Sequence, residues 1–211
     1  MSLGNTAYVI DDDPSIRSLI EATLQAEGIA VRTFASAEEF AGFTMPDGVS
    51  CILLDLEMPG LSGLEFLEKH FQGKSGCPVI VVTAHGSVPA AVKSLKLGAV
   101  DFLEKPFERP VLIKAVTTAL EADRVRREAI GAREEVRKRL ASLSKREAEL
   151  LGAVIDGKST KMIADELGIS ARTVDHHRAN LMAKMRAANV ADLVRMSVEA
   201  GFAAKPPVPP S

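Results

Sequence analysis

Two short runs of consecutive apolar residues, at positions 51–54 and 79–82, constrain the fold of the first half of this 211-residue chain. Strands that are apolar on both faces are typical of the centre of a parallel sheet that helices cover from both sides. Further strand patterns, at 6–10, 30–34 and 100–103, alternate with helical patterns up to about residue 120. The sequence therefore predicts five strands and five helices in a doubly wound α/β sheet.

Residues suited to phosphoryl chemistry follow four of these strands. Acidic residues at 11–13 follow the first strand, Asp55 follows the third, Thr83 the fourth and Lys105 the fifth. In an open α/β sheet, groups at the carboxyl ends of the strands converge on one crevice. Carboxylates, a hydroxyl and an ammonium group in one crevice suit a divalent cation and a phosphoryl group. We therefore expect a phosphate-handling site at this edge of the sheet.

The second half of the chain shows helical patterns only. Residues 121–141 are rich in charged and helix-forming residues and extend the fifth helix, either as a solvated linker or as a two-stranded coiled coil. From Ser144, which opens a capping box with Glu147, four helices follow up to about residue 200. The Pro-rich segment 203–211 is expected to be disordered.

Charge is unevenly distributed along the chain, although the formal net charge is −2. Residues 1–120 contain nine Lys and Arg against fifteen Asp and Glu, whereas residues 142–211 contain ten against eight. An acidic first half suits a metal site, and a mildly basic second half permits nucleic-acid binding. Cys51 and Cys77 lie beside apolar strands without metal-site spacing, so we expect buried structural thiols.

Composition gives two further expectations. Aromatic residues make up only 4% of the chain and Trp is absent, so the core must be largely aliphatic. No apolar run approaches the roughly 20 residues of a membrane-spanning helix, and no signal peptide is visible. We therefore expect a cytoplasmic protein in a reducing compartment, without a membrane partner.

The residues at the strand ends closely resemble the receiver domain of two-component response regulators. The resemblance covers about residues 5–120 and rests on Asp11-Asp12, Asp55 with Met58-Pro-Gly60, Thr83-Ala84 and Lys105-Pro106-Phe107. It implies a five-stranded parallel sheet with flavodoxin-like strand order. It also implies that Asp55 takes a phosphoryl group from the phosphohistidine of a sensor histidine kinase.

The same resemblance assigns roles to the neighbours of Asp55. Mg²⁺ would be bound by Asp12, by Asp55 and by the main-chain carbonyl of Glu57, with Asp11 acting through water. Mg²⁺ and Lys105 would together offset the charge that develops on the phosphoryl oxygens.

A conformational switch is also implied by the resemblance. Thr83 would move toward a phosphoryl group on Asp55, and Phe102 would turn into the vacated space. The face around residues 88–97 and 111–119 would then change and form a homodimer.

Three details of the site follow from the resemblance alone. The Lys105–Pro106 peptide bond is expected to be cis. Glu57 and His85, each two residues after a site residue, match positions that tune the rate of dephosphorylation. Asp13 has no role in the resemblance and is expected to be a solvated acid near a helix start.

Residues 142–202 resemble the four-helix DNA-binding domain of the LuxR/NarL/FixJ family, and the FixJ branch in particular. The resemblance rests on segments 143–147, 159–164, 167–170, 172–174, 177–185 and 193–196. Apolar residues on the inward faces leave a helix with outward polar groups that can lie in a major groove. The residues expected to contact double-stranded promoter DNA are Lys161, Arg172, Thr173, Asp175, His176, Arg178, Ala179 and Lys184.

The sequence therefore predicts a response regulator that is phosphorylated on Asp55 and controls transcription, more often by activation than by repression. The expected parts are a receiver domain at 1–120, a helical linker at 121–141, a helix-turn-helix domain at 142–202 and the tail. Two alternatives remain open: a hydrolase with an aspartyl-phosphate nucleophile and a flavodoxin-like cofactor carrier. The hydrolases normally place a second Asp where Glu57 stands, and the carriers need a phosphate loop where acids stand here. We therefore do not expect an enzyme.

Overall fold

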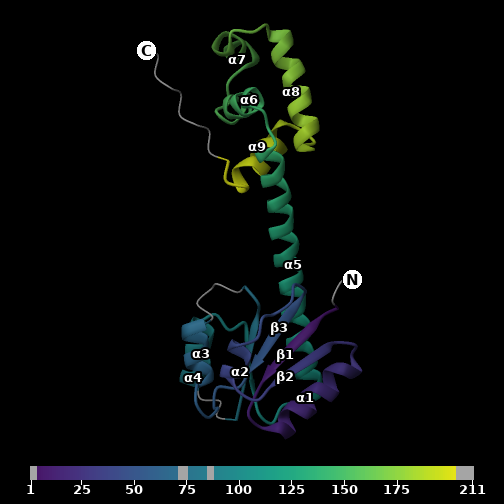
Figure 1. Ribbon diagram of the computed structural model, residues 1–211, viewed down its shortest axis with the longest axis vertical. Coiled ribbons are helices and arrows are strands. Elements are labelled where there is room, and N and C mark those ends of the chain that lie inside the picture. Colours follow the sequence, from purple (N-terminus) through teal and green to yellow (C-terminus); the bar gives the residue numbers. More distant parts are fainter. Residues whose placement is uncertain (1–3, 71–75, 85–87, 203–211) are drawn as a thin grey trace. The chain divides into compact units, whose positions relative to one another are not determined.

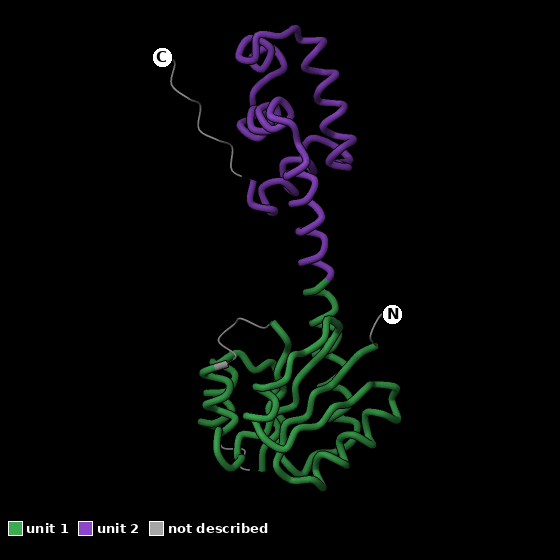
Figure 2. Tube along the Cα trace, in the orientation of Figure 1, with its two compact units in different colours: residues 1–127 green, residues 128–211 purple. Residues whose placement is uncertain are grey.

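The computed structural model describes residues 4–70, 76–84 and 88–202 of the chain (Figure 1). The chain divides into two compact units, Met1–Arg127 and Glu128–Ser211 (Figure 2). The division falls within helix α5 (Arg109–Ala141), and each unit has its own hydrophobic core. Within the described ranges, none of the helices combines the length and the apolar character that crossing a bilayer requires.

The first unit is a parallel sheet with helices on both faces. The strand order is β2-β1-β3-β4-β5 and every neighbouring pair is parallel, which confirms the predicted doubly wound, flavodoxin-like fold. Its elements in chain order are β1 (Thr6–Ile10), α1 (Pro14–Ala26), β2 (Ala30–Phe34), α2 (Ala37–Ala41), β3 (Ser50–Leu54), α3 (Gly63–His70), β4 (Val79–Thr83), α4 (Val88–Lys96), β5 (Asp101–Glu104) and the first part of α5.

Strand β3 shows why the central runs are apolar without interruption. Cys51 and Leu53 face the core under α1 and α5, whereas Ile52 and Leu54 face the core under α2, α3 and α4. Successive side chains of a strand point to opposite faces, so a strand with helices on both sides needs apolar residues at every position. Both cysteines are buried and free, as predicted, and burial raises the pKa of the Cys77 thiol to about 11.

Polar side chains fix the starts of several helices. The Asp13 carboxylate accepts a hydrogen bond from the amide of Ser15 at 2.8 Å and so caps α1, where Pro14 is the first helical residue. Ser62 and Glu65 form a reciprocal capping box at the start of α3. Asp13 therefore has a structural role that the sequence did not indicate.

The second unit packs four helices around one apolar core. They are α6 (Lys145–Ile155), α7 (Thr160–Leu167), α8 (Ala171–Met185) and α9 (Val190–Glu199). Ser144 and Glu147 form the predicted capping box, and Ser170 caps α8. Gly168, at φ +64°, ends α7 in the left-handed region that Gly adopts without steric cost, which permits the tight turn into α8.

The second part of α5 belongs to the core of this unit. Val136 and Leu140, which the sequence assigns to the linker, pack against the apolar core that α6, α7, α8 and α9 share. Arg137 donates from Nε to the carbonyl of Ala200 at 3.1 Å, and Arg139 donates to the carbonyl of Met185 at 3.2 Å. Because Val136 and Leu140 pack against this core, they do not belong to an apolar stripe that a coiled coil could use.

Candidate phosphoacceptor site and nucleic-acid interface

The acidic residues of the first unit meet at the carboxyl edge of the sheet. Asp11 directly follows β1 and Asp55 directly follows β3, and these two strands pair in register up to Ile10 and Leu54. Side-chain oxygens of Asp11, Asp12 and Asp55 all lie within 4.8 Å of one another. Asp11 and Asp55 are buried, whereas Asp12 is exposed to solvent. The predicted convergence of these carboxylates is therefore present in the structure.

Lys105 joins two of these carboxylates. Its ammonium lies 2.6 Å from Oδ2 of Asp11 and 2.7 Å from Oδ2 of Asp55. Burial raises the pKa of Asp11, although the hydrogen bond from Lys105 opposes that change. Burial also acts to lower the pKa of Lys105, but the hydrogen bonds and charges of both carboxylates outweigh it, so this pKa lies above its usual value. The lysine is therefore held in its charged form beside the two acids.

Main-chain amides orient the remaining carboxylate oxygens. Oδ1 of Asp55 accepts a hydrogen bond from the amide of Glu57 at 3.0 Å, and Oδ1 of Asp11 accepts one from the amide of Asp13 at 2.9 Å. Gly63, the first residue of α3, lies so close to the backbone of Asp55 that a Cβ there would clash with its carbonyl oxygen. The start of α3 therefore packs directly against the loop that carries Asp55.

The donor set fits a hard divalent cation. Mg²⁺ prefers oxygen ligands and usually uses one or two carboxylates, with water completing its octahedral shell. Two buried carboxylates and one exposed carboxylate within 4.8 Å supply such ligands, and the exposed Asp12 leaves a side open to water. The cluster is thus chemically suited to Mg²⁺.

Thr83 and Phe102 lie on the neighbouring strands β4 and β5. Thr83 is fully buried at the end of β4, and its carbonyl accepts a hydrogen bond from the amide of Lys105 at 2.8 Å. Phe102 is half-buried and packs against the core under α2, α3 and α4. The Lys105–Pro106 peptide bond is cis, as predicted. His85 lies outside the described residues.

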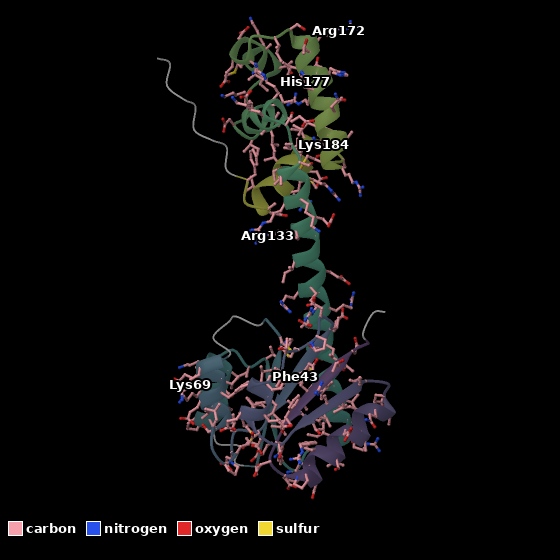
Figure 3. All side chains as sticks on the ribbon, viewed as in Figure 1. Phe43, Lys69, Arg133, Arg172, His177 and Lys184 are labelled. Carbon is pink, nitrogen blue, oxygen red and sulfur yellow. The ribbon has the colours of Figure 1, made fainter. Side chains whose placement is uncertain are left out.

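Helices α7 and α8 with their tight turn form a helix-turn-helix in the second unit. Arg172 projects from the first turn of α8 and Lys184 from its last turn (Figure 3). Of the residues expected to contact DNA, six are exposed and two, Thr173 and Arg178, are half-buried. The exposed ones are Lys161, Arg172, Asp175, His176, Ala179 and Lys184.

Several of these side chains have partners within the unit. Lys184 donates to Oε2 of Glu147, the residue that completes the capping box of α6 with Ser144, at 2.9 Å. Arg178 reaches the hydroxyl of Thr160 at the start of α7, at 3.5 Å. These contacts brace the helices against one another, so both cations have a structural contact that sequence reasoning did not anticipate.

One polar residue on the outward face of α8 was missed from the sequence. Asn180 is exposed, and its side-chain amide lies 3.2 Å from Nε2 of His176, one helical turn earlier. The spacing of four residues places both side chains on one face of the helix. Counting four residues forward from His176 would have identified Asn180.

The folds and sites of the two units define a signalling protein that couples a phosphoacceptor-type α/β domain to a DNA-binding helix-turn-helix. Residues 7–117 match the response regulator receiver domain family, and residues 141–197 match the LuxR family of bacterial regulatory proteins. The chain therefore belongs to the two-component response regulators that control transcription through a LuxR-type domain.

Several relatives match almost the whole chain. The transcriptional regulatory protein FixJ of Azorhizobium caulinodans is 46% identical, over 93% of both chains, and FixJ of Rhizobium meliloti is 42% identical, over 93% of this chain and 97% of that one. The solved structure of the response regulator StyR has a TM-score of 0.81 at 36% identity, covering 93% of this chain and all of the other. These relatives are regulators, so the prediction that the chain is not an enzyme is confirmed.

Proposed function

We propose that Asp55 is the phosphoacceptor and receives its phosphoryl group from the phosphohistidine of a sensor histidine kinase. The observation that carries the proposal is the contact of buried Asp55 with Lys105 at 2.7 Å, within a cluster of three carboxylates. In the transfer, the P–N bond of the phosphohistidine breaks and a P–O bond to an Asp55 carboxylate oxygen forms. The ammonium of Lys105 stabilises the charge on the transferring oxygens because it already lies beside the carboxylate.

Asp12, Asp55 and the main-chain carbonyl of Glu57 would hold Mg²⁺, and Asp11 would contact it through water. The cation would supply positive charge that permits several carboxylates to remain ionised side by side. Asp11 and Lys105, both already hydrogen-bonded in the protein, keep the site assembled around the acceptor oxygen.

The switch would run through Thr83 and Phe102 to an apolar surface. Val88, Val92 and Leu95 of α4 and Val111 of α5 have exposed fractions of 45–76%. Val88, Val92 and Leu95 recur every three or four residues and so share one face of α4, and apolar patches on a surface are typical of protein interaction sites. We infer that this face forms a homodimer when Asp55 is phosphorylated.

The dimer would present two copies of α8 to double-stranded DNA. One module has only a small excess of basic residues and should bind weakly, whereas two modules on a two-fold promoter site bind together. Arg172, at the exposed start of α8, is the best candidate for a base or phosphate contact. We propose that binding occurs in the cytoplasm and activates transcription.

The experiment is DNA binding by the full chain with and without beryllofluoride, a mimic of the phosphoryl group, in the presence of Mg²⁺. Wild type should bind tighter with the mimic and sediment as a dimer. Asp55→Ala should lose both responses, and Asp55→Asn should not be labelled by a phosphodonor. Asp13→Asn is the matched control, because an Asn keeps the cap of α1 and Asp13 lies outside the carboxylate cluster. Equal DNA binding by wild type and Asp55→Ala would contradict the proposed switch. A wild-type protein that stays monomeric with beryllofluoride would contradict the proposed dimer.

A further inference from the structure

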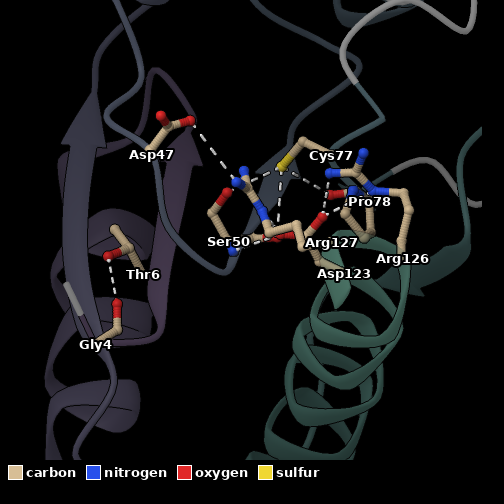
Figure 4. A network of polar contacts seen from close by, with 9 residues as sticks. All are labelled: Gly4, Thr6, Asp47, Ser50, Cys77, Pro78, Asp123, Arg126 and Arg127. Atoms are coloured by element: carbon tan, nitrogen blue, oxygen red, sulfur yellow. Dashed lines mark hydrogen bonds and ion pairs between the residues drawn. The ribbon is translucent and has the colours of Figure 1, made fainter. Parts of the chain in front are cut away.

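A second buried polar cluster lies at the opposite edge of the sheet, around Asp123 of α5 (Figure 4). The Asp123 side chain is 0% exposed, yet its residue type is almost never fully buried without partners. Oδ2 accepts hydrogen bonds from the amide of Ser50 at 3.0 Å and from Nε of Arg127 at 2.7 Å. Oδ1 accepts from Nε of Arg126 at 3.0 Å and from a second nitrogen of that guanidinium. One carboxylate thus joins two arginines of its own helix to the first residue of β3.

The two arginines extend this cluster to neighbouring loops. Arg127 lies 3.9 Å from the carboxylate of Asp47, in the segment that leads into β3. Arg126 lies against Gly76, where an added Cβ would clash with its guanidinium. Segments before β3 and before β4 therefore meet the same turn of α5.

The position of Asp123 along α5 indicates which part of the helix the cluster holds. Leu112, Val116 and Leu120 bury the preceding turns of α5 against the sheet, and the apolar contact ends there. Asp123 lies one turn further, and Val125 and Ile130 beyond it are more than half exposed. The carboxylate therefore fixes the helix at the point where apolar packing against the receiver ceases.

Strand β3 links this cluster to the phosphoacceptor site. The amide that Asp123 binds belongs to Ser50, the first residue of β3, and Asp55 follows the last residue of the same strand. All five residues of β3 are buried. Close-packed interiors transmit strain, so a displacement at one end of this short, buried strand can be passed to the other end.

We propose that Asp123 is a positioning residue for signal output, which anchors the emerging part of α5 to β3 so that a change at Asp55 reaches the helix. The proposal rests on the proposed function of Asp55. Without the anchor, the receiver would still be phosphorylated, but the turn of α5 after Leu120 would lose its hydrogen bond to the start of β3. A change at Asp55 that is passed along β3 would then no longer reach the helix.

The test compares Asp123→Asn with wild type in the full chain. Asn keeps the shape of the side chain but removes the charge that holds both guanidinium groups. Asp55 labelling by a phosphodonor with Mg²⁺ should stay close to the wild-type rate. The ratio of DNA affinities with and without beryllofluoride should fall by about tenfold, within the usual range of coupling between two sites. Glu121→Gln is the matched control, since Glu121 is an exposed acid of the same helix that pairs with Arg124.

Each outcome has a separate meaning. If folded Asp123→Asn keeps the wild-type ratio of affinities, Asp123 is not a positioning residue. If wild type is not labelled on Asp55, the proposed function fails instead, independently of Asp123. Should Asp123→Asn not fold, hydrogen exchange in wild type decides: beryllofluoride should alter exchange of the Ser50 amide and of residues 121–127, and unchanged exchange at both would overturn the proposal.

Discussion

The ammonium of Lys105 lies 2.7 Å from Oδ2 of Asp55, although the two residues follow strands separated in the sheet by β4. Lys105 also contacts Asp11 at 2.6 Å, so a single cation balances two buried carboxylates from β1 and β3. This arrangement makes Lys105 important for the chemistry in two opposite ways. If Asp55 accepts a phosphoryl group, as proposed, Lys105 would stabilise the charge of that group, and it would compete with a metal ion for the carboxylates.

Lys105→Met should therefore separate these two effects. Loss of the ammonium should reduce the rate of Asp55 labelling by about 10²–10³-fold, the usual effect of removing one charge-stabilising donor. Mg²⁺ should bind more tightly, because the carboxylates lose a competing cation. Labelling rates and calorimetric titration with Mg²⁺ measure the two effects, with the exposed Lys69→Met as control. Weaker Mg²⁺ binding in Lys105→Met would contradict the competition.

The main features of the first unit follow from local patterns in the sequence. Uninterrupted apolar runs reveal a sheet covered on both faces, and strand ends bring Asp11, Asp55 and Lys105 together whatever the loop details. Asp123 could not be found in this way. It occurs in a charged helical segment, and its burial depends on an amide 73 residues earlier in the chain. The half-burial of Arg178 likewise depends on how α7 crosses α8, which spacing within one helix does not reveal.

The capping box at Ser144 predicts a pH-dependent contribution to stability. Hydrogen bonds from Lys184 and from the Ser144 amide lower the pKa of Glu147 to about 2. Because the pKa in the folded state lies below that of the unfolded chain, near about 4.3, this contribution is present above pH ~4.3 and disappears as the pH falls toward ~2. The free energy of unfolding of wild type should therefore fall over this window.

Glu147→Gln should reduce the same dependence. The Gln carbonyl can still accept the Ser144 hydrogen bond, so only the ion pair with Lys184 is lost, at a cost of about 0.5–1 kcal/mol. Urea unfolding followed by helical circular dichroism between pH 2 and 7 measures the difference. The half-buried Glu149→Gln, which loses a surface pair with Arg146, is the control. A wild-type and a Glu147→Gln curve that stay parallel across the acid range would contradict this role of Glu147.

Leu140 provides a test of how far the linker extends. Its side chain packs against the core of the second unit, whereas that of Ile130 on the same helix is 54% exposed. Leu140→Ala should lower the free energy of unfolding by about 1–2 kcal/mol, less than for a fully buried leucine, and Ile130→Ala should change it by under about 0.5 kcal/mol. Thermal unfolding of both variants measures this. Equal effects would mean that residues 121–141 form one independent linker, as the sequence suggests.

Two arginines of α8 should affect DNA binding in different ways. Arg172 is exposed on the first turn, so Arg172→Ala should weaken DNA binding and leave the thermal midpoint unchanged. Loss of one phosphate contact should also reduce the slope of log affinity against log salt by about 1.

Arg178 is half-buried and reaches Thr160, and its Nε is buried without a partner among the described residues. Arg178→Ala should therefore lower both DNA affinity and the thermal midpoint, because it removes a brace between α7 and α8. Titrations at several salt concentrations, together with thermal unfolding, distinguish the two; an unchanged midpoint for Arg178→Ala would show that its contact with α7 does not stabilise the domain.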